Sequence, residues 1–248
     1  MKILVCISHV PDTTSKINFT NNNTEFDSNG ITYVINPYDE FGLTRAMIIK
    51  EKSGATVTVI NVGPSSTEPT LRKALAIGAD NAVRINAEPS DANYVARLLA
   101  NYAKNENFDL IITGRESIDY NGGAVPGMLA TYLDIPFVNA CFGLELNGNQ
   151  ATVIREIDGG KETLQCNLPM LLAGQKGLVE EKDLRIPAMR GIMMARKKPL
   201  TVIEASDAEK QTSVLKFDLP EAKAACTMIE ADNVDKLVQL LHSEAKVI

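Results

Sequence analysis

The sequence predicts an α/β protein with a doubly wound, mostly parallel sheet, an antiparallel extension and a C-terminal arm. Short apolar runs that suit buried strands alternate with helical patterns through the first two-thirds of the chain. A hairpin signal follows Pro136, and regular periodicity fails from Leu184 onward. These three observations predict the sheet, its extension and the arm, in that order.

The alternating part contains four strand–helix units. The expected strands span residues 3–7, 56–62, 81–85 and 110–113, and the expected helices span residues 36–52, 67–77 and 91–104, with a fourth ending near residue 133. Asn36 suits the N-cap of the first helix, Pro37 its first position and Asp39 its first turn, where the helix dipole favours an acid. Gly54 and Gly78 are expected to end the first two helices.

The second part of the chain extends the same sheet. Strand-like runs at residues 137–146 and 150–157 are separated by the turn signal at residues 147–149, and shorter strands follow at 162–166 and 170–173. We therefore expect one α/β domain over residues 1–183, followed by a loop over 184–200 and an arm over 201–248.

The arm is polar and irregular over residues 200–223 and ends in a helix at about residues 234–245. It is expected to need another surface to bury its apolar residues. A tail packed on its own domain is the alternative.

Composition excludes several classes of function. The net charge of −6 and the isoelectric point near 5.1 argue against nucleic acid as a partner. The sequence lacks any apolar run near the ~18 residues that would insert into a bilayer, and its first strand is too short for a signal segment. The four cysteines lack C-x-x-C spacing, which argues against a zinc site or disulfides. A cytoplasmic protein is expected.

The sequence offers no self-contained catalytic site and no metal site. Neither G-x-G-x-x-G nor a P-loop motif is present. His9 lacks a neighbouring nucleophile or second metal ligand, so a polar loop residue is expected there. Glu116 and Asp119 are loop carboxylates without an evident partner. For Asp119 we expect either a hydrogen bond to a ribose or a cap on the next helix.

A bound adenine nucleotide is nevertheless expected, in a Rossmann-like arrangement. The apolar wall at Cys6, the helix start at residues 36–39, Val62 and the loop at residues 119–127 should meet at one end of the sheet. Gly122 and Gly123 let the backbone approach a phosphate at a helix N-terminus. Each signal is weak alone, and their convergence carries the hypothesis.

A second informative segment spans residues 185–200. It combines Met189, Met193 and Met194 with a basic run at residues 196–198. Methionine is common on surfaces that fit several partners, and nearby cations steer an acidic one. A short amphipathic helix that covers the core remains an equal alternative.

The chain resembles the beta subunit of electron transfer flavoproteins over essentially its full length. The family signature matches Val153, Arg155, Asp158, Gly159, Gly160, Glu162, Leu164 and the segment 169–173. Further family motifs follow in the expected order at residues 36–37, 62–64, 76–80 and 117–119.

The resemblance implies a heterodimer with an alpha subunit that holds most of the FAD, while the beta subunit buries a structural AMP. The nucleotide site carried over by position comprises Cys6, Asn36, Pro37, Tyr38, Asp39, Val62, Asp119, Asn121, Gly122, Gly123, Ala124, Val125, Pro126 and Gly127. Tyr38 is also expected to approach the flavin. The docking segment for partner dehydrogenases comprises Met189, Ile192, Met193, Arg196 and Lys197, with Met189 where many relatives have leucine.

The implied function is an electron carrier, not an enzyme, between acyl-CoA-type flavin dehydrogenases and a membrane quinone reductase. Asn121 and Ala124 depart from the family pattern, where an acid and a glutamine are usual. One alternative is a bifurcating form with a second FAD in this site and NADH as donor. Another, from a different class, is a stand-alone ATP-binding or adenylating protein.

Overall fold

The computed structural model describes residues 1–223 and 225–248, so Ala224, inside the expected arm, lies outside the described residues. The strands are β1 Lys2–Cys6, β2 His9–Pro11, β3 Phe19–Thr20, β4 Glu25–Phe26, β5 Tyr33–Ile35, β6 Thr56–Val62, β7 Asn81–Asn86, β8 Leu110–Gly114, β9 Phe137–Asn147, β10 Gln150–Ile157, β11 Gly160–Asn167, β12 Met170–Gly174 and β13 Leu200–Glu204. The α-helices are α1 Pro37–Ser53, α2 Glu68–Ile77, α3 Ala92–Ala103, α4 Ala124–Leu133, α5 Met189–Ala195 and α6 Val234–Ser243, and short 3-10 turns span Ser65–Thr67 and Glu181–Asp183.

The main sheet of the described residues has nine strands in the order β11-β10-β9-β12-β8-β1-β6-β7-β13. The strands from β9 to β13 in this order run parallel, whereas β10 and β11 are antiparallel to their neighbours. After β1 the chain adds strands on one side of β1 through β6 and β7. It then crosses to the other side through β8, which makes the gap between β1 and β8 the topological switch point.

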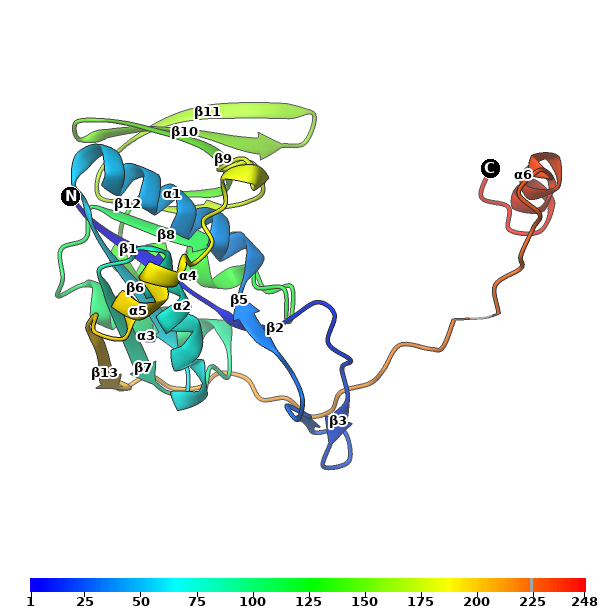
Figure 1. The fold of residues 1–248 in the computed structure, drawn as a ribbon, viewed down its shortest axis with the longest axis horizontal. Helices are drawn as coiled ribbons and strands as arrows, with labels where there is room; N and C mark the ends of the chain where they lie inside the picture. The colour runs from blue at the N-terminus through cyan, green and yellow to red at the C-terminus, as the bar shows by residue number, and fades with distance from the viewer. Residues whose placement is uncertain (224) are drawn as a thin grey trace.

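Helices cover both faces of the sheet, which confirms the doubly wound fold (Figure 1). One core lies between the sheet and α1, α2 and α5, and includes Val5, Leu43 and Leu71. The other lies under α3 and α4, and includes Leu98 and Leu129. Residues alternate between the two cores along β1 and β8, as they must in strands buried on both faces.

The sequence located the sheet extension well and missed several short strands. The hairpin of β9 and β10 and the further strands β11 and β12 are confirmed as parts of one sheet. The expectation of irregular chain from residue 200 was wrong for Leu200–Glu204, because β13 pairs in parallel with β7. The antiparallel pairs β2–β5 and β3–β4 were not expected.

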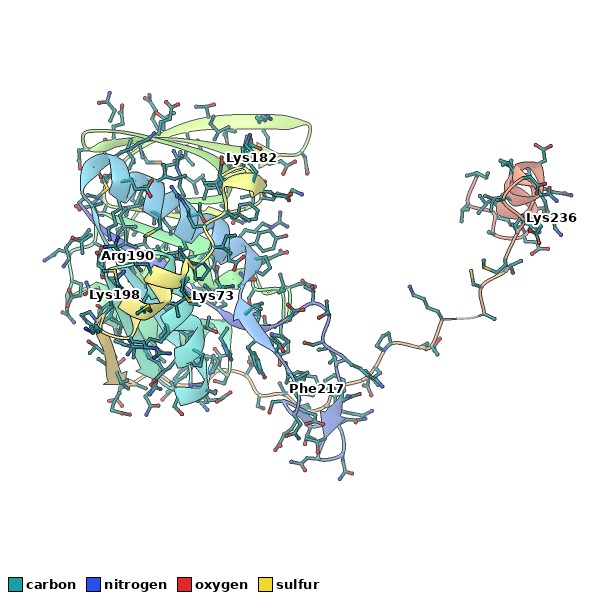
Figure 2. All side chains as sticks on the ribbon, in the orientation of Figure 1. Lys73, Lys182, Arg190, Lys198, Phe217 and Lys236 are labelled. Atoms are coloured by element: carbon teal, nitrogen blue, oxygen red, sulfur yellow. The ribbon has the colours of Figure 1, made fainter. Side chains whose placement is uncertain are left out.

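The arm leaves the sheet after β13 and crosses the molecule in extended form (Figure 1). The carboxylate of Asp91 accepts hydrogen bonds from the backbone N–H groups of Gln211 (2.7 Å) and Thr212 (3.3 Å). Further along, Phe217 stacks on Phe19 of the β3–β4 hairpin, with ring centroids 4.6 Å apart (Figure 2). Beyond this stack the arm ends in α6, which stands apart from the sheet and has no buried residue.

Candidate functional site

The carboxyl ends of β1, β6 and β8, with the loop over residues 115–123, form what we call the switch-point edge. Ligands of doubly wound sheets bind at such a switch point because the diverging connections leave a crevice there. The structure brings Cys6, Asp39 and Val62 to this edge, as the sequence predicted.

Asp39 joins the two strands at the switch point. Its Oδ2 accepts a hydrogen bond from the backbone N–H of Ser8 (2.7 Å), just past β1, and its Oδ1 accepts one from Gly114 (2.8 Å), at the end of β8. The side chain is almost fully buried. A Cβ on Gly114 would overlap Asp39 Oδ1 and Tyr38 Cβ, so only glycine fits this contact. Asp39 therefore holds the edge together and has both oxygens engaged by the backbone.

The charge of Asp39 depends on pH in the neutral range. Burial raises the pKa of this carboxyl to about 7, and the hydrogen bonds that it accepts only partly oppose the rise. Burial, with the nearby Asp39, also raises the pKa of the Cys6 thiol. Cys6 is therefore a neutral apolar wall residue at neutral pH, as its position in the predicted site requires.

We expect the free energy of unfolding to fall as the pH rises from about 4 to about 7. In this interval folded Asp39 keeps a proton that the unfolded chain has already released, so raising the pH favours unfolding. The contribution is about 3–4 kcal/mol, fully present below pH 4 and lost above pH 7. Urea unfolding between pH 4.5 and 7.5 measures it, with Asp39→Asn as the non-titrating reference. Parallel pH profiles for the two proteins would contradict the assignment.

Asn36 is the N-cap residue of α1, and its side chain positions the loop after β8. The N-cap position was predicted, but among the described residues the side chain makes no capping hydrogen bond; the carbonyl oxygen of Asn36 accepts from the N–H groups of Asp39 and Glu40. The Asn36 amide instead donates to the carbonyl oxygen of Glu116 (2.9 Å) and accepts from the N–H of Ile118 (3.2 Å). Because these partners are backbone groups, Asn36 fixes the path of the loop and not its side chains.

The loop itself leads into an uncapped helix. Ser117 and Gly122 exchange backbone hydrogen bonds across it, and Asn121 adopts a left-handed conformation (φ 50°). Asp119 accepts from the Ser117 hydroxyl (2.5 Å) and from the N–H of Tyr120 (2.9 Å). It therefore does not cap α4 as one expectation had it, and within the described residues no side chain caps that helix. The first N–H groups of α4 remain available to an anion.

Gly123 begins α4 and is tightly placed. A Cβ there would lie 3.2 Å from the carbonyl oxygen of Arg115, whereas one on Gly122 would meet nothing within 4 Å. The loop can thus approach a ligand closely at both glycines, which fits the predicted phosphate contact.

Under α3 and α4, the edge is lined by small and apolar side chains. Cys6 and Val62 belong to this core, and Thr113 lies on the same face because it is two residues past Ile111 on β8. The hydroxyl of Thr113 is buried and has no hydrogen-bond partner among the described residues. The sequence did not indicate a role for Thr113 in the site, because a threonine inside a strand resembles any other β-branched strand residue.

Tyr38 stands on the other side of the loop, beside charged groups. The guanidinium of Arg115 lies 5.6 Å from the centre of the Tyr38 ring. Arg115 also donates to Gln175 Oε1 (3.0 Å), and Gln175 donates to Glu156 (2.8 Å). These hydrogen bonds link the loop of the switch-point edge to Gln175, which follows β12, and to Glu156 on β10.

His9 is engaged in packing, but it begins strand β2 instead of lying in the predicted loop. Its ring stacks on Tyr33 at 4.2 Å, and its Nδ1 shares a hydrogen bond with the Thr70 hydroxyl (2.7 Å). Burial lowers the pKa of His9. Within the described residues, no group of three or more His, Cys, Asp or Glu side chains could hold a metal ion.

Two cavities of the described residues lie elsewhere on the chain. One, of about 470 Å³, lies between the C-terminal end of α4 and the start of β9. The other, of about 310 Å³, lies between α3 and β13. Residues 119–124 of the loop at the switch-point edge are exposed, so a ligand there would need a further cover to be buried.

The segment after residue 185 presents an apolar helix face. Four apolar side chains of α5 are exposed, and we call them the methionine face: Met189, Ile192, Met193 and Met194. Arg196 and Lys197 follow and are also exposed. The opposite side of α5 packs on α2, where a Cβ on Gly191 would overlap the carbonyl oxygen of Ala76. The same short helix therefore covers the core with one side and exposes apolar side chains on the other.

Two cations fasten α5 to α2 by capping both helices. Arg72 of α2 donates to the carbonyl oxygens of Ala195 and Lys198, each at 2.8 Å. Lys198 in turn donates to the carbonyls of Leu75 (2.9 Å) and Ala79 (2.6 Å) at the end of α2. Figure 2 shows Lys73, Arg190 and Lys198 around α5. The methionine face is therefore held rigidly.

Comparison with known proteins decides the family. The model of the electron transfer flavoprotein domain matches residues 24–208. The electron transfer flavoprotein subunit beta of Bacillus subtilis is 38% identical, with both chains covered in full. The chain belongs to the electron transfer flavoprotein beta subunit family. The Syntrophomonas wolfei subunit beta is 34% identical over all of this chain and 98% of its own, and the human one is 31% identical over 97% and 98%.

The signature of the electron transfer flavoprotein beta subunits has a structural position here. Its matching residues, from Val153 to Ala173, run through β10, β11 and β12. β12, the last strand of the signature, pairs with β8. Gln175, the residue after β12, accepts a hydrogen bond from Arg115. Within the described residues, no helix of this beta subunit is long and apolar enough to cross a membrane.

Proposed function

We propose that this chain pairs with an electron transfer flavoprotein alpha subunit, which holds most of the FAD, and that this chain binds AMP as a structural ligand. Family membership supports the pairing. The observation that carries the AMP site is the uncapped start of α4, reached through Gly122 and Gly123 and set beside the switch point by Asn36. Unpaired N–H groups and the helix dipole there suit a phosphate.

Other residues of the same site lie where they would contact the base and the phosphate of the nucleotide. Cys6 and Val62 supply an apolar wall for the base, and the backbone of the 119–127 loop surrounds the phosphate. Pro37 and Asp39 would support this wall from α1. Asp39 would do so through the hydrogen bonds that its carboxylate accepts from Ser8 and Gly114. The partner subunit would provide the cover that the exposed loop needs.

The proposed role is electron transport in the cytoplasm. The flavin accepts electrons from acyl-CoA-type dehydrogenases and passes them toward a membrane quinone reductase. The residues of this chain bind, orient and shield the nucleotide, and none needs to act as an acid or base. Tyr38 with Arg115 is the part of this edge proposed to face the flavin.

We expect Met189→Ala to slow reduction by a partner dehydrogenase about tenfold without changing nucleotide content. Met189 is 76% exposed at the start of a rigid helix, the setting of an interface anchor. Stopped-flow reduction of the complex measures the rate. Met189→Leu, which conserves side-chain volume, is the matched control and should behave like the wild type. Loss of AMP from the alanine variant would show a structural role instead.

Extraction of nucleotides from the purified complex tests the proposed function. One FAD with one AMP per heterodimer supports it. Two FAD would favour the bifurcating alternative. A chain that remains alone when co-expressed with its alpha subunit, and that binds or cleaves ATP by itself, would favour the adenylating alternative.

A further inference from the structure

Thr113 lies next to the nucleotide site and is not explained by the fold. It is the residue of β8 immediately before Gly114, and it pairs in register with Ala173 of β12. Cys6 lies beside it on β1, on the same face, since Val5 is aligned with Ile112. Thr113 is 4% exposed. Its side chain therefore lies inside the switch-point edge, under the helices that cover this face.

The hydroxyl of Thr113 is a buried polar group that the described residues leave without a hydrogen bond. Such a group costs stability, because it loses its water without gaining a partner. A valine would fill nearly the same volume without this cost. A hydroxyl at this position is thus expected to have a partner that the isolated chain does not supply.

The geometry indicates which part of a nucleotide the hydroxyl would meet. Helix α4 packs over β12 and β9, on the Thr113 side of the switch point, and its N-terminus is the proposed phosphate site. Cys6 and Val62 lie toward β6, where the apolar wall suits the base. Thr113 stands between these two regions.

We infer that the Thr113 hydroxyl hydrogen-bonds the ribose–phosphate part of the adenine nucleotide bound by this chain. The inference rests on the proposed function and deepens it, since it adds a specific side-chain contact from β8 to the nucleotide. The contact would favour nucleotides over free adenine, because free adenine lacks the ribose and phosphate groups that the hydroxyl would hydrogen-bond.

Thr113→Val and Thr113→Ser in the co-expressed heterodimer test this assignment. Valine removes the hydroxyl and keeps the shape, while serine keeps the hydroxyl. The affinity of the nucleotide-stripped complex for AMP is measured by titration calorimetry, with adenine as a second probe, and the melting temperature of the stripped complex is measured in parallel. We expect Thr113→Val to weaken AMP binding about tenfold, with adenine binding unchanged and the melting temperature equal or higher. Thr113→Ser should bind AMP within about threefold of wild type.

Each contrary outcome has a separate meaning. Equal AMP affinity in Thr113→Val would overturn the contact while leaving the proposed function intact. A lower melting temperature of the stripped Thr113→Val complex would show that the hydroxyl has a partner within the protein, and would also overturn it. A wild-type complex that binds no adenine nucleotide would overturn the contact together with the proposed AMP site.

Discussion

Deletion of residues 220–248 is expected to abolish co-purification with the alpha subunit while the rest of the chain stays folded. The deleted part carries exposed apolar side chains that the sheet domain does not cover: Met228, Val234, Leu237, Val238, Val247 and Ile248. Exposed apolar side chains of this kind suit an interface with another protein, which is the role we propose for the arm. The stack of Phe217 on Phe19 and the bonds to Asp91 are retained. The melting temperature of the truncated chain should thus stay within about 2 °C of the full chain.

Two point variants separate the apolar face from the arm as a whole. Leu237→Asp places a charge on the apolar face of α6 and should weaken association at least about a hundredfold. Gln239→Asp places the same charge on the other side of the helix and should leave association unchanged. Pull-down with a tagged alpha subunit and analytical ultracentrifugation measure both. A truncated chain that still forms a stoichiometric complex would contradict the proposed role of the arm.

Gly114→Ala is expected to destabilise the sheet domain by about 3 kcal/mol or more and to remove nucleotide from the complex. The added Cβ would overlap Asp39 Oδ1 and Tyr38 Cβ, and would lie 3.0 Å from Asn36 Nδ2. These groups cannot move aside without breaking the hydrogen bonds by which Asp39 links β1 and β8. Overpacking alone costs about 1–3 kcal/mol. Urea unfolding gives the loss of stability, and nucleotide extraction gives the loss of ligand.

Gly122→Ala is the matched control for this substitution. It lies in the same loop, and its added Cβ would meet nothing within 4 Å. Its unfolding free energy should stay within about 0.5 kcal/mol of the wild type. If Gly114→Ala unfolds at the same urea concentration as Gly122→Ala, the switch point is not held in the way described.

The sequence predicted the central strands because each is a short apolar run buried on both faces. β1, β6 and β8 were located to within about a residue for this reason. β13 could not be located in this way, since Leu200–Glu204 is a half-exposed edge strand whose pairing with β7 depends on a distant part of the chain. The pair β2–β5 is only three residues long and includes Pro11, which argues against a strand.

The candidate site was predictable in its position more than in its contacts. The carboxyl ends of parallel strands share one edge, so Cys6 and Val62 were expected to meet there. The role of Asn36 could not be predicted, because local capping rules are blind to partners 80 and 82 residues away. The unpaired hydroxyl of Thr113 is likewise a property of its three-dimensional surroundings. That the predicted residues bind a nucleotide, and that the chain divides at residues 183 and 200, stay predictions.

The stack of Phe217 on Phe19 attaches the arm to the sheet domain at a point well before α6. Sixteen residues, 218–233, separate this anchor from α6, which gives the helix a maximum reach of roughly 55 Å. In the proposed complex, a contact between the sheet domain and the alpha subunit would confine α6 to the volume within this reach, at an effective concentration on the order of millimolar. If α6 dissociates from the alpha subunit, it then rebinds before the two subunits separate. A modest affinity at each of two contacts is therefore enough for a long-lived complex.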